Sequence, residues 1–140
     1  MKNIFILTLL FFSTLAISQQ SSITWQTDYL KVLQDARTSN KNIIVYFTDN
    51  NTTKAIEQFF LSSEFTKNSS KYLYLKLYKA ELAPNQGLKN YTKRLSSIYN
   101  KEDIFPAVMV MDAFNTEKIS LLKSFNLKDR KAFLQELKSL

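Results

Sequence analysis

The sequence predicts an α/β domain with a mixed central sheet of four to five strands and helices on both faces. Segments with apolar residues at helical spacing alternate with short runs of β-branched and aromatic residues. One such run, 43–47, is apolar at every position and another, 72–78, at nearly every position, which is typical of strands buried on both faces. A closing strand–turn–strand segment adds an antiparallel pair to the parallel strands that the alternation implies.

The first part of the domain is predicted as helix, strand, helix. A helix over about 28–39, capped by Thr27 or Asp28, is followed by a strand at 43–47 and a second helix over about 52–61. The apolar positions that mark the two helices are Tyr29, Leu30, Val32, Leu33 and Ala36 in the first, and Ala55, Ile56, Phe59 and Phe60 in the second.

The second part begins with a strand at 72–78 and a loop that contains Pro84 and the single glycine, Gly87. A third helix follows over about 88–99, because Leu88, Tyr91, Leu95, Ile98 and Tyr99 recur at helical spacing.

The last part is predicted as a strand at 106–111, a hairpin turn at 112–117, a strand at 118–125 and a helix over about 128–137. The final helix is expected to face inward through Ala132, Phe133 and Leu137. A short strand at 23–25 would be the fifth strand of the sheet.

Residues 1–18 are predicted to be a removable export signal, which leaves residues 19–140 as one domain with a single core. Lys2 gives the segment a positive start, a short apolar run follows, and Ala16-Ile17-Ser18 places small residues where cleavage after Ser18 requires them. A membrane anchor is the competing interpretation, but the apolar stretch is shorter than the about 20 residues that span a bilayer. We therefore expect a periplasmic or secreted protein with no stable membrane anchor after cleavage.

The net charge of +7 raises the question of nucleic acid as a partner. Lysine and arginine are spread along the whole chain, and no cluster is longer than Lys93-Arg94. The sequence has no groove-reading or RNA-binding motif. A mildly basic solvated surface is the better interpretation, and no nucleic-acid partner is expected.

The 140 residues contain neither cysteine nor histidine, and this composition excludes several kinds of chemistry. Thiol–disulfide exchange needs a thiolate, and a threonine nucleophile needs an adjacent base. The remaining carboxylates, such as Asp49, Glu57, Asp103 and Asp112, have no calcium-loop spacing. We expect no catalytic residue, no metal site and no cofactor.

The order of elements, with Pro106 leading the third long strand, resembles the thioredoxin fold. The local sequence is similar to that of exported thioredoxin-like proteins of the kind found in Bacteroidetes-type bacteria, over roughly residues 23–137. The segments that carry the resemblance are 23–25, 36–41, 43–48, 60–65, Tyr99 and 104–112. The resemblance implies a cis peptide bond before Pro106 and identifies Lys54 with the lysine that commonly follows the family's cysteine pair.

The departure from the family lies where its two cysteines occur. Alignment on Lys54 places them at Asn50 and Thr53, and alignment on Phe47 places the first near Thr52 or Thr53. The former active-site loop and candidate peptide-binding surface is therefore Asp49, Asn50, Asn51, Thr52, Thr53 and Lys54, together with Phe105 and Pro106.

Two functions from different classes follow from this resemblance. The first is a redox-inactive domain that binds an envelope or secreted protein, or an extended peptide, at the former active-site surface. The alternative is an enzyme with non-thiol chemistry, or with chemistry completed by a cysteine of a partner. A stable domain without a molecular role is a third interpretation, which a polar, closed surface beside Phe105 would favour and a contiguous apolar patch would oppose.

Because no thiol is present, the protein is expected to give no rate above background in an insulin-reduction assay with dithiothreitol. The turbidity of precipitating insulin chains is the readout, and a cysteine-containing thioredoxin is the positive control. A clear catalysed rate would contradict the exclusion of thiol chemistry.

Overall fold

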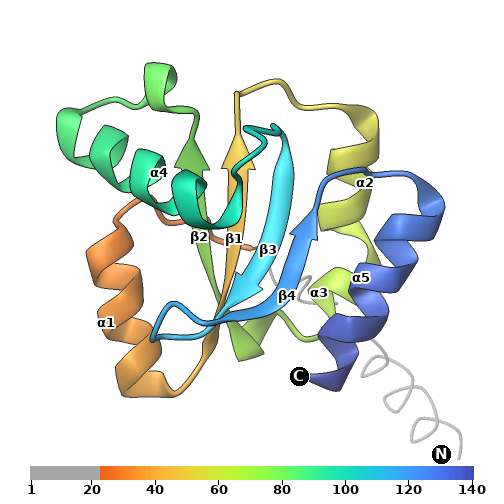
Figure 1. The fold of residues 1–140 in the computed structure, drawn as a ribbon. Coiled ribbons are helices and arrows are strands. Elements are labelled where there is room, and N and C mark those ends of the chain that lie inside the picture. The colour runs from red at the N-terminus through yellow and green to blue at the C-terminus, as the bar shows by residue number, and fades with distance from the viewer. Residues whose placement is uncertain (1–22) are drawn as a thin grey trace, which may run out of the picture.

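A computed structural model describes residues 23–140 and shows a four-stranded mixed sheet between two layers of helices (Figure 1). The predicted export signal at 1–18 lies outside the described residues. The strands are β1 (Asn42–Thr48), β2 (Tyr72–Tyr78), β3 (Ala107–Met111) and β4 (Glu117–Leu122), in the order β2-β1-β3-β4. The helices are α1 (Tyr29–Ser39), α2 (Lys54–Leu61), α3 (Ser63–Thr66), α4 (Gln86–Tyr99) and α5 (Leu127–Ser139).

The strand β1 lies in the interior of the sheet and pairs on both sides. It runs parallel to β2, from the pair Asn42 and Tyr72 to the pair Thr48 and Tyr78. On its other side it runs antiparallel to β3, which is in turn antiparallel to β4. The mixed sheet and the closing hairpin predicted from the sequence are confirmed, with four strands.

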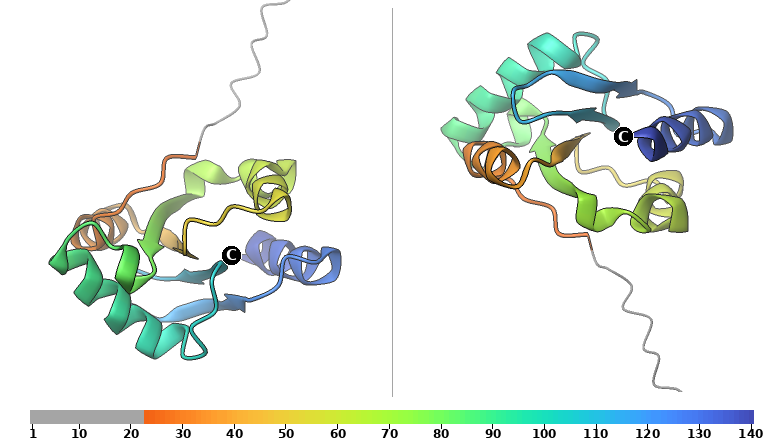
Figure 2. Two further views of the ribbon diagram at one scale, coloured as in Figure 1. Left: turned by 90° about the horizontal axis from the view of Figure 1, so that it is seen from above. Right: turned by 90° about the horizontal axis from the view of Figure 1, so that it is seen from below.

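The residues of β1 contribute alternately to two hydrophobic cores, because successive side chains of a strand point to opposite faces. Ile43, Val45 and Phe47 belong to the core that α1 and α4 cover. Ile44 and Tyr46 belong to the core that α2, α3 and α5 cover. The two views along the sheet in Figure 2 show these two helical layers on opposite sides of the strands. The uninterrupted apolar run is thus explained by burial on both faces.

The core under α2 and α5 is dominated by aromatic rings. Phe59 lies at its centre, with ring-centroid distances of 5.0 Å to Phe65, 5.5 Å to Phe125 and 5.9 Å to Phe133. Offset and edge-to-face pairs at such distances stabilise a core beyond the burial of their area. Trp25 packs edge-on against Phe60 at 5.0 Å and so joins the segment before α1 to this core.

The predicted fifth strand at 23–25 does not form. Instead, Gln26 alone makes a parallel bridge to Leu75, with its N–H donating to the Tyr74 carbonyl at 2.9 Å and its carbonyl accepting from the Lys76 N–H at 2.8 Å. Trp25 turns its side chain into the aromatic core, so packing and not strand pairing explains this short apolar segment.

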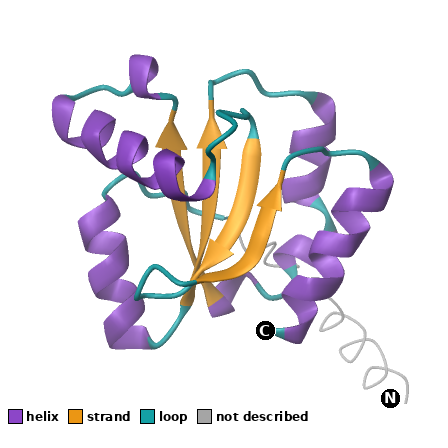
Figure 3. Ribbon diagram, in the orientation of Figure 1, coloured by secondary structure: helices purple, strands orange, loops and turns teal. Residues whose placement is uncertain are grey.

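Several predicted faces and boundaries differ from the structure, which Figure 3 shows by element type. Ala132 was expected to face inward but is exposed, because Phe133 and Leu137 already fill the buried stripe of α5. Leu30 and Ile98 are likewise exposed, at 56% and 50%. Helix α4 begins at Gln86, two residues before the predicted start, because the Asn85 side chain caps it by accepting from the Leu88 N–H.

The other boundaries differ by a few residues at element ends. Helix α2 begins at Lys54 and not near residue 52, β3 begins at Ala107 after the proline, and β4 spans Glu117–Leu122 where 118–125 was predicted. Within residues 23–140, no helix combines the length and hydrophobicity that crossing a bilayer requires.

Phe59→Ala is expected to lower the free energy of unfolding by about 3–5 kcal/mol, because Phe59 is 1% exposed and its removal leaves a cavity at the centre of the aromatic core. Leu61→Ala, in the same helix but 68% exposed, is the matched control and should change it by less than about 0.5 kcal/mol. Urea unfolding followed by circular dichroism measures both. Equal losses for the two variants would contradict this description of the core.

Candidate functional site

The two segments predicted to form the site lie at the same end of the sheet. The last pair between β1 and β3 joins Phe47 and Ala107. Beyond it, the chain continues from β1 into the 49–53 loop that leads to α2, while 104–106 leads into β3. Both segments therefore lie at the carboxyl end of β1, the upper edge of the sheet in Figure 1.

The 49–53 loop is organised by its own short polar side chains. The Asn50 N–H donates to the Thr48 hydroxyl at 3.0 Å, and the Asn51 N–H donates to Asp49 Oδ1 at 3.0 Å. The Asn51 side-chain amide donates to the other Asp49 oxygen, also at 3.0 Å. Asn50 adopts a φ of 69°, in the left-handed region that asparagine tolerates better than most residues. The loop is therefore built of residues suited to a turn.

The end of the loop forms the start of α2. Thr53 is the N-cap, and its hydroxyl accepts from the Ile56 N–H at 3.4 Å. Thr52, Thr53 and Lys54 are all exposed. Because no histidine or cysteine exists in the chain, neither threonine has a neighbouring base of the usual kind, and capping accounts for Thr53.

Asp49 is the one acidic residue of the loop, and its pKa lies below the ordinary value. Partial burial acts to raise the pKa, but the hydrogen bonds from Asn51 and the charge of Lys79 favour the carboxylate and outweigh it. Asp49 is therefore ionised at neutral pH and accepts the hydrogen bonds that order the loop.

Lys79 joins the 49–53 loop to the 104–106 segment. It directly follows β2, and its N–H donates to the Thr48 carbonyl at 2.7 Å. Its ammonium lies 5.6 Å from the centroid of the Phe105 ring and 3.8 Å from an Asp103 oxygen. The side chains of Lys79 and Asp103 are both largely exposed, so the ion pair between them is weak. Lys79 matters because it contacts both segments.

Phe105 is held at its side chain and left unpaired at its backbone. The Phe105–Pro106 peptide bond is cis, as the resemblance implied. The half-buried Phe105 ring packs edge-on against Phe47, with centroids 6.4 Å apart. Within residues 23–140, neither the Phe105 N–H nor its carbonyl has a hydrogen-bond partner.

Both backbone groups of Ile104, the residue before Phe105, are hydrogen-bonded, in contrast to those of Phe105. The buried Asn100 side chain accepts from the Ile104 N–H at 3.0 Å and donates to the Ile104 carbonyl at 2.8 Å. Asn100 thereby fixes the approach to Phe105, and the free backbone groups begin at Phe105.

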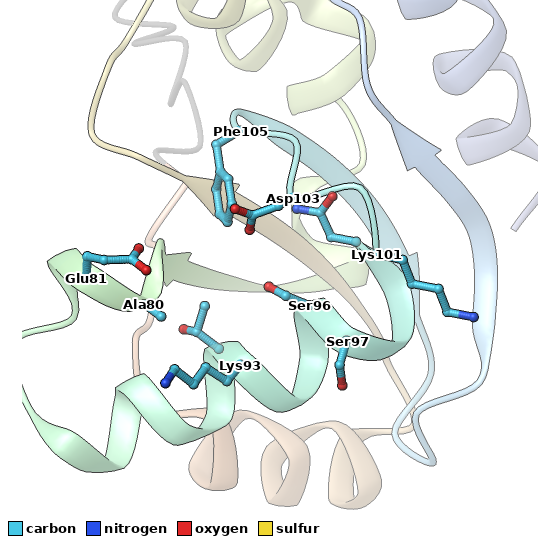
Figure 4. Close-up of a pocket in the computed structure, with 10 residues that line it drawn as sticks. Ala80, Glu81, Lys93, Ser96, Ser97, Lys101, Asp103 and Phe105 are labelled. Atoms are coloured by element: carbon cyan, nitrogen blue, oxygen red, sulfur yellow. The ribbon is translucent and has the colours of Figure 1, made fainter.

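A depression of about 260 Å³ lies beside Phe105, between α4, the turn at Ala80–Leu82 and the 100–105 segment (Figure 4). Ten residues line it, and all but Ala80 and Phe105 have polar or charged side chains: Ala80, Glu81, Thr92, Lys93, Ser96, Ser97, Asn100, Lys101, Asp103 and Phe105. None of the large exposed apolar side chains lies in 49–54 or 104–106. Within residues 23–140, the surface is thus hollowed and not closed, and no large exposed apolar side chain forms a patch in the two segments.

Tyr46, Phe105 and Phe114 differ in how far they are exposed. Tyr46 is buried in the aromatic core, and Phe105 is half-buried beside the depression. Phe114 is 76% exposed at the turn between β3 and β4, where the Arg37 guanidinium lies 5.9 Å from its ring centroid. Phe105 alone of the three belongs to the site.

Sequence reasoning missed Lys79, Asn100 and the depression on α4. A signal for Lys79 existed, because parallel strands end together and the residue after β2 must lie near the residue after β1. Asn100 and the α4 hydroxyls gave no comparable signal, since their positions depend on how α4 packs. Within residues 23–140, no group of three acidic, histidine or cysteine residues could hold a metal ion.

The sheet order, the helices on both faces and the cis proline before β3 define a thioredoxin-like fold. The structure is similar to one solved as "DsbH Oxidoreductase", with a TM-score of 0.68 and 19% identity over 90% of this chain and 88% of that one. At this identity the likeness shows the fold. No protein-family model and no curated protein sequence matches the chain.

Proposed function

We propose that this protein is a redox-inactive thioredoxin-like domain that binds an extended segment of a partner protein or peptide at the surface formed by 49–54 and 105–106. With residues 1–18 as an export signal, the partner is an envelope or secreted protein and the location periplasmic or secreted. On this proposal the chain is one of the exported thioredoxin-like proteins of the Bacteroidetes-type bacteria that its sequence resembles, without their cysteine pair.

One observation carries the proposal: the backbone N–H and carbonyl of Phe105 are unpaired beside an ordered, exposed loop. Main-chain groups of this kind bind an extended segment by adding a strand-like partner. The Phe47 and Lys79 contacts hold the Phe105 ring, so the groups are presented in a fixed position. Preorganisation of this kind lowers the entropic cost of binding.

The lack of large exposed apolar side chains in the two segments determines which interactions can hold a partner at this surface. With no large apolar side chain exposed in the two segments, affinity has to come from main-chain hydrogen bonds and polar contacts. Such binding is modest in strength and suits a reversible interaction. The enzymatic alternative rests on no comparable feature within residues 23–140.

A library of random peptides displayed on phage, panned against the immobilised protein, should yield sequences that bind to this surface. The double variant Asn50→Gly/Phe105→Ala is expected to weaken the selected peptides about tenfold or more, because it removes a loop side chain and the ring that holds the Phe105 backbone. Glycine at residue 50 keeps the positive φ, so the loop conformation is retained. Affinity is measured by fluorescence anisotropy.

Phe114→Ala is the matched control, since it removes an exposed aromatic side chain from the turn between β3 and β4 and should leave affinity within twofold. Thermal melts confirm that each variant is folded. The proposal fails if panning enriches no sequence, or if the selected peptides bind the double variant as well as the unaltered protein.

A further inference from the structure

Helix α4 is the only one of the five helices within residues 23–140 that carries no acidic residue. Its charged side chains are Lys89, Lys93 and Arg94. Each of the other four helices includes at least one aspartate or glutamate, which gives the mixture of signs that a solvated surface ordinarily shows. The charge of α4 is therefore of a single sign.

The three cations lie on the solvent side of the helix. At about 100° per residue, Lys89, Lys93 and Arg94 fall within an arc of about 140°. The buried residues Thr92 and Leu95 lie on the opposite side. Lys93 and Arg94 are exposed and Lys89 is half-buried. We call these three side chains the basic face of α4.

Helix stability does not account for the basic face. Lys89 and Lys93 are four residues apart, a spacing at which like charges destabilise a helix. The first turn of α4 has no acidic residue to interact favourably with the helix dipole. Within residues 23–140 none of the three cations forms an ion pair, and Glu102 and Asp103, just beyond α4, pair with lysines of other segments. The charges of the basic face are thus free for a partner.

The basic face borders the depression beside Phe105. Lys93 belongs to both, and Figure 4 shows it on α4 at the rim of the depression. An extended chain rises about 3.3 Å per residue, so about two to four of its residues cross a depression of about 260 Å³. A segment that leaves Phe105 on this side therefore reaches Lys93 within a few residues.

We propose that the segment paired to Phe105 is acidic where it leaves Phe105 and follows α4, so that a run of aspartate or glutamate contacts the basic face. This rests on the proposed function, because the segment is the one that pairs with Phe105, and it adds the charge of the partner. Carboxylates suit both kinds of cation, since arginine binds them through paired hydrogen bonds and lysine as a point charge. Charge complementarity of this kind gives specificity and speeds association.

Glu81 favours a single acidic segment over a broad anionic surface. It is the one acidic residue of the depression lining without an ion pair, and it lies on the turn at Ala80–Leu82. A membrane or a nucleic-acid duplex at this edge would meet Glu81 together with the cations, which weakens the attraction. A single extended chain can follow α4 alone.

The test compares peptides that share the core Val-Thr-Val-Thr and carry a block of three Glu, three Gln or three Lys residues at one end or the other. Affinity for the protein expressed from the full chain is measured by fluorescence anisotropy. At one of the two ends, the Glu block should strengthen binding about tenfold over the Gln block at low salt, as three exposed ion pairs of ordinary strength would give. This gain should disappear between about 0.01 M and 1 M salt, because the Debye length falls from about 30 Å to about 3 Å.

The charge-reversed variant Lys93→Glu/Arg94→Glu should invert the preference, so that the Lys block binds more tightly than the Glu block. A gain for the Lys block cannot arise from unfolding. The matched control is Lys128→Glu/Lys131→Glu on α5, which changes the net charge equally at two exposed positions and should keep the Glu preference. Retention of the Glu preference by the α4 variant would overturn the proposal.

The ¹⁵N chemical shifts of the protein separate failure of this proposal from failure of the proposed function. If all blocks bind equally and shift 104–106, the acidic segment is overturned and the proposed function stands. If the Glu block shifts 89–94 but no peptide shifts 104–106, the basic face stands and the pairing with Phe105 is overturned. If no peptide binds, both are overturned.

Two other anions test the class of partner. An oligothymidylate and vesicles of phosphatidylglycerol should each bind more weakly than the Glu peptide. Tighter binding of either one that is lost in Lys93→Glu/Arg94→Glu would assign the basic face to that class and overturn the acidic segment.

Discussion

The burial of β1 on both faces is the constraint on which the rest of the structure depends. Ile43, Val45 and Phe47 enter one core and Ile44 and Tyr46 the other, so two helical layers must cover the same strand. Because β1 is an interior strand, its carboxyl end lies between β2 and β3. The residues that follow β1 and β2 therefore meet the residues that lead into β3, and the candidate site at that edge is a consequence of how the cores are filled.

Three chain segments converge at this edge, and Lys79 is the residue that contacts them all. It reaches the β1 end through the Thr48 carbonyl, and its side chain reaches Phe105 and Asp103. The edge has the ordered loop, the capped helix and the cis proline of a thioredoxin-like fold, but asparagine and threonine occupy the positions that the resemblance assigns to cysteine. The scaffold is thus retained while the thiol chemistry is absent, and main-chain and side-chain hydrogen bonding are what the surface can offer.

The sequence was sufficient to predict the fold class, the two-sided burial of β1 and the closing hairpin, because the spacing of apolar residues indicates each of them. It was not sufficient where tertiary packing decides. Trp25 suggested a strand but serves the aromatic core, and Ala132 fits a helical stripe that Phe133 and Leu137 already fill. The loop and Phe105 were predicted as candidate site residues, whereas Asn100 was not, since its contact with Ile104 depends on how α4 packs.

Amide hydrogen exchange at Phe105 tests the central claim most directly, since the claim is that this backbone is free until a partner segment binds it. The account predicts fast exchange of the Phe105 N–H in the free protein, strong protection of the Phe47 N–H inside the sheet, and marked slowing at Phe105 when a selected peptide saturates the protein. Protection of Phe105 equal to that of Phe47 in the free protein, or unchanged exchange at Phe105 in the saturated complex, would contradict it.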